Sequence, residues 1–267
     1  MPEHTSFFSY LIAMFPAIGE NAKKLGHTLF GHPVTAHNME PLLMSLFIVL
    51  LLATLALITR SKIASIDKAV IPEDTLTLRT VMELGVGYVY DSMKDIMGPR
   101  RAKQYFPVVG TSAFFVFFSN VLGLIPGFAP PTASWNITLG CALVVFVAFN
   151  YYGLKENGIG YIKHLAGPVW WLAWLILPLE LISVCLRPLT LSIRLMLNMS
   201  VDHLLSGIVH SLFMWIVPLF VMALGVVIVV VQTMVFMLLS SVYIGLATEH
   251  EEHDEPAHGH KKEHAHA

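Results

Sequence analysis

Long apolar stretches separated by short polar segments set the pattern of this chain. A bilayer core of about 30 Å requires roughly 20 apolar residues in a helix. Such stretches occupy 41–59, 106–128 and 137–152, and a largely apolar run follows over 168–247. The pattern predicts an all-α integral membrane protein whose membrane domain covers 41–248.

The final run is too long for one span, so we divide it into 168–214 and 218–247. The break could fall near Asp202 or just before Pro218, where a proline can open a new helix. The polar pattern described below continues through Asp202, which favours Pro218. Both segments exceed a perpendicular span, so we expect tilted or kinked helices that form a long hairpin. The total is then about five membrane helices.

Basic residues predict the orientation. The loop 60–105 holds Arg60, Lys62, Lys68, Arg79, Lys94, Arg100, Arg101 and Lys103, whereas the turn after 106–128 has no lysine or arginine. The positive-inside rule places this loop and the C-terminus in the cytoplasm and the segment 1–40 outside, although Lys23 and Lys24 oppose it. Within the loop, Met82, Val86, Val89, Met93 and Ile96 recur at helical spacing. Two interpretations stay open, an interfacial amphipathic helix and a polar loop with a short helix.

Composition narrows the class further. Only 13% of the 267 residues are charged, against about a quarter in soluble domains. The net charge of −2 offers no argument for a nucleic-acid partner. Cys141 and Cys185 lie in apolar stretches and are interpreted as small core residues. The sequence contains no GxxxxGK[ST] phosphate loop, so the chain should not hydrolyse ATP alone. The N-terminal segment does not have the pattern of a removable signal peptide.

A polar stripe runs through the fourth span. Its residues recur three or four apart and so share one side of a helix: Glu180, Ser183, Arg187, Thr190, Arg194, Asn198 and Asp202. An arginine at the bilayer centre costs about 2.5–3.5 kcal/mol on insertion scales and keeps its proton. The stripe should therefore face water, counter-charges or another subunit.

The two arginines allow different explanations. Arg187 can pair with Glu180, two turns back on the same face, or reach a lipid headgroup. Arg194 lies two turns from Arg187 and from the next acid, Asp202, so we expect it to pair with a carboxylate on another chain. Gln232 and Tyr243 share a face of the fifth span. Gln232 is either a simple interhelical hydrogen bond or a residue set near the depth of Arg194 by antiparallel pairing.

Three segments carry a family resemblance. "LRPLTLSIRLMLNMSVDH", "VVQTMVFMLLSSVYIGLATEHEEH" and "YFPVVGTSAFFVFFSNVLGLIPGFAPPTASWNITL" resemble subunit a of the rotary F-type ATP synthase membrane sector, over about 42–253. The resemblance implies a non-catalytic, proton-translocating stator without cofactor or metal. Its last two helices would lie, strongly tilted, along a ring of c subunits. Peripheral-stalk b subunits would be further partners, and we expect a bacterial inner membrane.

The resemblance also implies roles for individual residues. Arg194 matches the arginine that faces the ring carboxylate and separates two aqueous half-channels. Glu180 matches an acid near the proton outlet, and Asn198 and Gln232 match polar neighbours of the arginine. His203, whose ordinary pKa of about 6.5 suits a relay, matches a proton-inlet position that Asp202 could share. Arg187 and Tyr243 are supporting residues.

Two departures from the family pattern stand out. Leu197 replaces a residue that is often small, which puts the packing against the ring in doubt. Gly225 replaces a second relay group that is often Glu or His. We therefore expect the proton inlet to depend more on Asp202, His203 and water, with His210 as a weaker substitute.

Two other functions fit parts of the sequence. The tail 249–267, which we expect to be disordered, contains six histidines and suggests a metal-ion transporter. Such a transporter should also place acids or histidines within its spans, where this chain has arginines that repel metal. The second rival, a proton-channel subunit of a redox complex, would lack the combination of Arg194, Asn198 and Gln232.

Overall fold

The computed structural model describes Met14 and residues 36–63, 77–125, 128–158, 173–212 and 216–248. Its elements are α3 (Ala36–Ile63), α5 (Leu78–Gly123), the short 3-10 helix η1 (Pro131–Ala133), α6 (Trp135–Asn157), α8 (Ala173–Leu212) and α9 (Ile216–Thr248). In this described part five helices are long and apolar enough to cross a bilayer. The predicted all-α membrane protein with about five membrane helices is confirmed.

The helices differ from the predicted spans mainly at their ends. α3, α6 and α9 extend a few residues beyond 41–59, 137–152 and 218–247. α8 runs without interruption through Asp202 to Leu212, and α9 begins at Ile216. Most of segment 1–40, the part 64–76 of the loop and the tail 249–267 lie outside the described residues.

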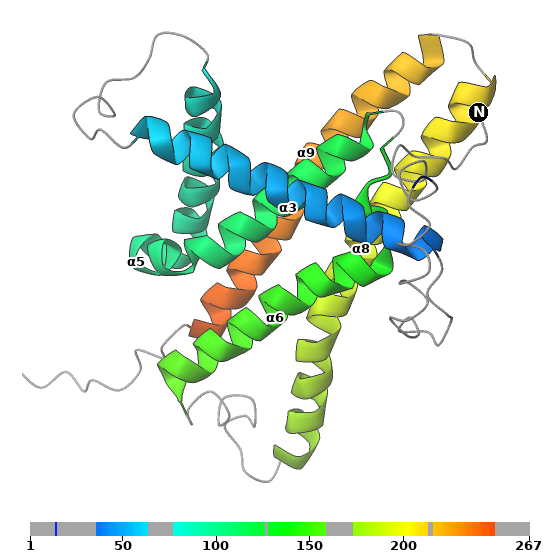
Figure 1. Cartoon of the computed structure of the whole chain (residues 1–267). Coiled ribbons are helices and arrows are strands. Elements are labelled where there is room, and N and C mark those ends of the chain that lie inside the picture. The colour runs from blue at the N-terminus through cyan, green and yellow to red at the C-terminus, as the bar shows by residue number, and fades with distance from the viewer. Residues whose placement is uncertain are drawn as a thin grey trace, which may run out of the picture.

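The helix α5 consists of two limbs that meet at Gly98. The Gly98 backbone is non-helical, with φ 81° and ψ 163°, a conformation that glycine adopts without strain. Pro99 follows and suits the first turn of the second limb, because proline lacks an N–H that would need a partner there. Figure 1 shows the two limbs pointing in different directions. The predicted bounds 106–128 are thus wrong at both ends, because the limb starts at Pro99 and ends at Gly123.

The first limb of α5 contains the amphipathic segment, and its regular helix contradicts the interpretation as a polar loop with a short helix. It is a regular helix, and its residues Val89 and Met93 are buried in the protein core. They pack in one cluster with Phe149 of α6 and with Met237 and Ile244 of α9. The apolar side of this helix therefore faces the protein interior, and only a part of it, including Val86, stays exposed.

One side of the last helix, α9, packs in the core. Its buried residues Met237 and Ile244 join the cluster formed by both limbs of α5. Phe236 joins a second cluster with Leu191 and Leu195 of α8. In Figure 1, α9 passes behind α3 and runs beside α8 near their connection. The hairpin of α8 and α9 is thus supported from behind by α5 and α6.

Gly123 closes the contact between α5 and α8. A Cβ atom built at this glycine would lie 2.7 Å from Cβ of Pro130 and would also collide with Cε of Met199 on α8. These distances, 2.7 Å to Pro130 and 2.4 Å to Met199, are below ordinary van der Waals contact. Only glycine lets the end of α5 approach this closely.

We expect Gly123→Ala to lower the melting temperature of the purified protein. Overpacking of a well-packed core costs about 1–3 kcal/mol, and the Pro130 ring cannot move without its backbone. Thermal unfolding in detergent measures the change. Gly140→Ala is the matched control, since no atom lies within 4 Å of its Cβ position. Equal melting temperatures for the two variants would contradict the predicted close packing.

Candidate functional site: the α8–α9 hairpin

Buried hydroxyl groups fix the rotation of α8. The Ser192 hydroxyl donates to the hydroxyl of Thr138 on α6 at 3.1 Å, and Ser200 donates to the Ala133 carbonyl at 3.3 Å. Both serines lie off the polar stripe. Since they hold the inner side of α8 against α6 and η1, the stripe is turned toward α9 and the outer surface.

Arg194 lies on the exposed surface of α8. Among the described residues no carboxylate approaches it within 4.0 Å. Its neighbours Leu197 and Val201 are also exposed, at 48% and 57%. A permanent cation therefore stands on an apolar surface with no counter-charge from this part of the chain.

Asn198 and Gln232 join the two helices beside Arg194. The Asn198 amide donates to Oε1 of Gln232 at 2.6 Å. Gln232 is buried, and its own amide nitrogen has no acceptor among the described residues. The predicted interhelical hydrogen bond of Gln232 is confirmed. Gln232 lies opposite Asn198, which is one helical turn from Arg194, and so it is not directly opposite the arginine. An unsatisfied buried donor costs about 1–3 kcal/mol, so this amide is suited to an additional acceptor.

Arg187 takes the first of its two predicted explanations. Its Nη2 lies 3.6 Å from Oε1 of Glu180, an ion pair in which both side chains are partly exposed. Its guanidinium also stands over the Tyr243 ring of α9, 5.3 Å from the ring centre. The two contacts between α8 and α9 have the same spacing on both helices. Asn198 follows Arg187 by eleven residues, and its partner Gln232 precedes Tyr243 by eleven residues. The two helices therefore run antiparallel in a constant register.

Asp202 is buried beside the backbone of Gly225. Only 8% of Asp202 is exposed. Its Oδ2 lies 3.2 Å from the position that a Cβ of Gly225 would take, and Leu124 Cδ2 lies 2.6 Å from the same point. The space of the missing side chain on α9 is therefore occupied by a carboxylate from α8.

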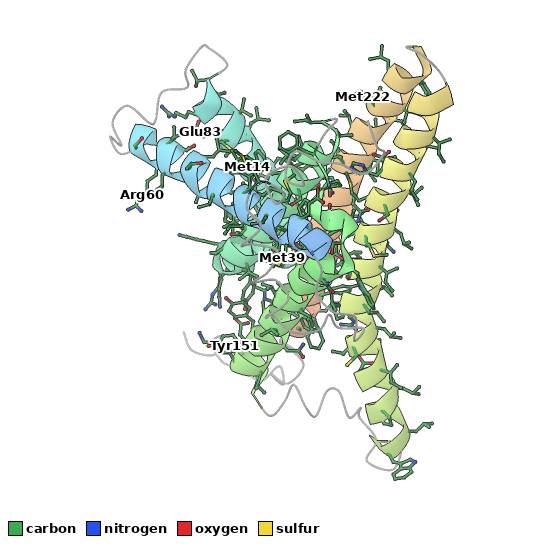
Figure 2. All side chains as sticks on the ribbon, turned by 45° about the vertical axis from the view of Figure 1, so that its right-hand side comes forward. Met14, Met39, Arg60, Glu83, Tyr151 and Met222 are labelled. Atoms are coloured by element: carbon green, nitrogen blue, oxygen red, sulfur yellow. The ribbon has the colours of Figure 1, made fainter. Side chains whose placement is uncertain are left out.

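His203 lies on the other side of Asp202. Its ring makes a hydrogen bond with the backbone of Gly123, and its Nε2 is buried without a partner among the described residues. A cavity of about 30 Å³ is lined by Asp202, His203 and residues of α5 and α9. This is room for a water molecule. Met222, labelled on α9 in Figure 2, marks the side of the hairpin where this cavity lies.

Asp202 also lines a second, larger cavity. This one has a volume of about 370 Å³ and lies between α8 and α9, with Asn198 and Gln232 on its wall. Its remaining lining is apolar, including Leu197 and Val201. The Asp202 carboxylate is thus shared by the small cavity at His203 and by the large cavity that reaches to one turn from Arg194.

The arrangement can hold and pass protons. It contains two titratable groups, amide groups that can orient water, and a cation that cannot be neutralised. In the described residues no group of three His, Cys, Asp or Glu side chains is placed to hold a metal ion. The histidines of the tail lie outside the described residues, and so does the side chain of His210.

Some of these contacts were not predicted from the sequence. Tyr243 was expected to share a face with Gln232, but its stacking under Arg187 was not foreseen. A signal was available, because the eleven-residue separation occurs on both helices. The anchoring role of Ser192 and Ser200 had no signal, since serine is common in apolar helices and its partners lie far away in the sequence.

Comparisons with known proteins identify the family of this chain. The sequence family described as ATP synthase A chain matches residues 7–245. The chain is 55% identical over 254 residues to ATP synthase subunit a of Sorangium cellulosum, covering 95% of this chain and 100% of that protein. It is 40% identical over 205 residues to ATP synthase subunit a of Helicobacter hepaticus, covering 76% and 89%. The chain belongs to the ATP synthase A chain family.

Proposed function

We propose that this chain is the proton-translocating stator subunit of a rotary ATP synthase. In this role it offers two aqueous half-channels to a ring of c subunits and does not itself catalyse ATP synthesis. The peripheral-stalk b subunits complete its surroundings in a bacterial inner membrane. The exposed charge of Arg194, which has no counter-charge in the described part of the chain, carries the proposal.

Arg194 is suited to a carboxylate that moves past it. A stationary ion pair within the chain would satisfy the arginine, as Glu180 does for Arg187. Arg194 instead faces outward beside exposed apolar residues, where a second apolar surface can pack and exclude water. A guanidinium in such surroundings favours the ionised form of a passing acid, so that the acid releases its proton there. The free amide group of Gln232 supplies an additional donor for the same carboxylate.

The proton inlet is assigned to His203, Asp202 and the two cavities that Asp202 lines. A proton passes from His203 across the small cavity to Asp202 and then through the larger cavity toward Asn198 and Gln232. The buried Nε2 of His203 is the group that exchanges this proton. Arg194, one turn further along α8, bars direct passage to the other half-channel because a cation repels protons.

The outlet is assigned to the opposite end of the stripe. Glu180 and Arg187 lie there, and Tyr243 holds Arg187 from the side of α9. The basic loop predicts that this end faces the cytoplasm, with the N-terminus outside. Arg187 acts as a positioning residue that keeps the Glu180 carboxylate at the mouth of the outlet.

We expect Arg194→Ala to reduce ATP-driven proton pumping strongly in vesicles that contain the assembled complex. The charge-assisted bond to the ring carboxylate is worth about 1.5–3 kcal/mol, so a loss of tenfold or more is expected. Passive proton leak should rise, since the barrier between the half-channels is gone. Quenching of a pH-sensitive dye measures both quantities.

The control removes a charge elsewhere. Arg100→Ala changes an exposed arginine of α5 and should pump at the wild-type rate. Subunit assembly and ATP hydrolysis are measured in the same vesicles. Pumping by Arg194→Ala at near wild-type rate, with assembly intact, would overturn the assignment.

A second prediction concerns Asp202 and Gly225. Asp202→Gly should greatly reduce pumping because the inlet loses its buried acid. Gly225→Asp should also reduce it, because its side chain meets the Asp202 carboxylate, whereas Leu124 Cδ2 is the end of a flexible side chain that can shift. Combining the two substitutions returns one carboxylate to the same space from α9. The double variant should therefore pump several-fold faster than Asp202→Gly alone.

The comparison of single and double variants separates proton relay from folding. Complex yield and melting temperature are recorded for all three proteins. If the double variant assembles and pumps no better than Asp202→Gly, the carboxylate in this space is not part of the inlet.

A further inference from the structure

A large apolar cavity lies outside the hairpin, between α3, α5 and α6. Its volume is about 940 Å³. It is lined along α3 from Ser45 to Arg60, a length of about 22 Å at the helical rise. Phe114 and Phe115 of α5 and Val144 of α6 form part of the opposite wall. The proton path assigned to α8 and α9 does not use this space.

The cavity exists because α3 packs at one end only. Met44 and Ile48 are fully buried, whereas Leu57 and Ile58 are largely or half exposed. Within the membrane span of α3 only 11% of the residues are buried, the lowest share of the five helices in the described part of the chain. α3 therefore separates from the other helices toward the end that carries Arg60. Figure 2 shows Met39 and Arg60 at the two opposite ends of this helix.

The polar residues of the lining leave its interior apolar. The hydroxyl groups of Thr59 and Thr111 donate to backbone carbonyls of their own helices, to Leu55 and Pro107. Hydroxyls bonded in this way present mainly their methyl groups to the cavity. The interior is thus suited to a hydrocarbon chain rather than to a polar ligand.

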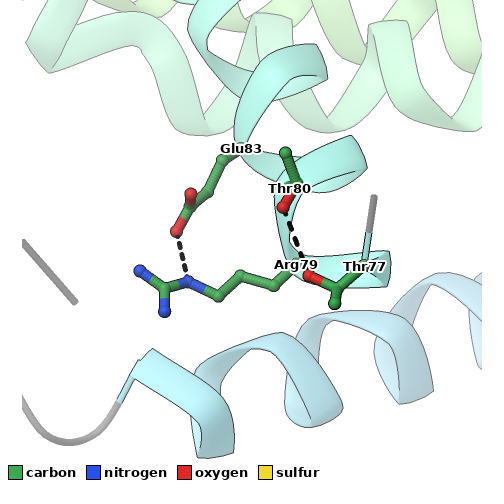
Figure 3. Close-up of polar contacts among 4 residues, drawn as sticks. All are labelled: Thr77, Arg79, Thr80 and Glu83. Carbon is green, nitrogen blue, oxygen red and sulfur yellow. Dashed lines mark hydrogen bonds and ion pairs between the residues drawn. The ribbon is translucent and has the colours of Figure 1, made fainter. Parts of the chain in front are cut away.

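Arg60 supplies a charge at the open end. No carboxylate of the described residues lies within 4.0 Å of it. The nearby Arg79 differs, because its Nε is bonded to Oε1 of Glu83 at 2.8 Å, as Figure 3 shows. Arg60 is therefore the cation of this region that suits an external anion.

We infer that this cavity binds one phospholipid with an anionic headgroup. Its phosphate lies at Arg60 and its acyl chain lies along α3 toward Ser45. One leaflet, headgroup included, measures about 20–22 Å, which matches the length of the cavity. A net negative headgroup is favoured over a zwitterionic one, because the latter carries its own cation beside the phosphate.

The test uses the assembled complex in vesicles that contain a trace of photoactivatable phosphatidylglycerol or phosphatidylcholine. A reactive group at the end of the acyl chain forms adducts that mass spectrometry assigns to peptides. Phosphatidylglycerol should label the peptides of Phe115 and Val144 about fivefold more than phosphatidylcholine, the ratio expected for one basic residue near a membrane surface.

Three variants make the result decisive. Arg60→Gln should bring the labelling ratio close to one, whereas Arg100→Gln, an exposed arginine outside the cavity, should leave it unchanged. Gly140→Phe should reduce labelling by both lipids, since its side chain enters the cavity without a clash at Cβ. If Gly140→Phe does not assemble, the two arginine variants still decide the question.

Three outcomes would overturn the inference. The first is equal labelling by the two lipids in the wild-type complex. The second is a labelling ratio that Arg60→Gln does not change. The third is the absence of lipid adducts on the lining, together with cross-links from it to a helix of another subunit, which would then be the occupant.

Discussion

The arrangement of this protein depends on a positive charge that hydrocarbon cannot neutralise. The guanidinium of Arg194 keeps its proton even in an apolar environment, so the only way to lower its energy is to supply an anion. Arg187 obtains one from its own helix through Glu180. Arg194 has none among the described residues, and the neighbouring surface is apolar and exposed. Under the proposed function, the carboxylate of another subunit supplies the missing anion at this surface.

Everything that touches α8 serves to keep this charge at one orientation. On the inner side, hydrogen bonds of Ser192 and Ser200 tie the helix to α6 and η1. On the α9 side, Asn198 bonds to Gln232 and Arg187 stacks on Tyr243. Each bond contributes only about 1 kcal/mol, but together they prevent rotation about the helix axis. A rotation of α8 by one residue, about 100°, would turn the arginine away from the outer surface that it now occupies.

The sequence predicted the helices and the polar stripe because both follow from periodicity within one segment. The spacing of Glu180, Arg187, Arg194 and Asn198 places them on one side of any α-helix. Contacts between segments were harder to foresee. The occupation of the space at Gly225 by Asp202 depends on the register between α8 and α9, which no local pattern encodes. The start of the second limb of α5 differs from the predicted 106, because the first long apolar run begins there, whereas the helix already begins at the Gly98–Pro99 pair.

The position of α9 in the core has a consequence for how the protein is made. Residues of both α5 limbs, among them Val89 and Tyr105, complete their packing only against Met237 and Ile244 near the end of the described helices. A chain is synthesised from its N-terminus, so these early helices enter the membrane before their partner exists. During that interval lipid or insertion factors cover their inner faces. Polar groups such as the Asn198 amide lack the hydrogen bond that Gln232 later accepts. The nascent chain is therefore most open to degradation until its final helix is inserted, and truncations close to the C-terminus should be removed by quality control as efficiently as large ones.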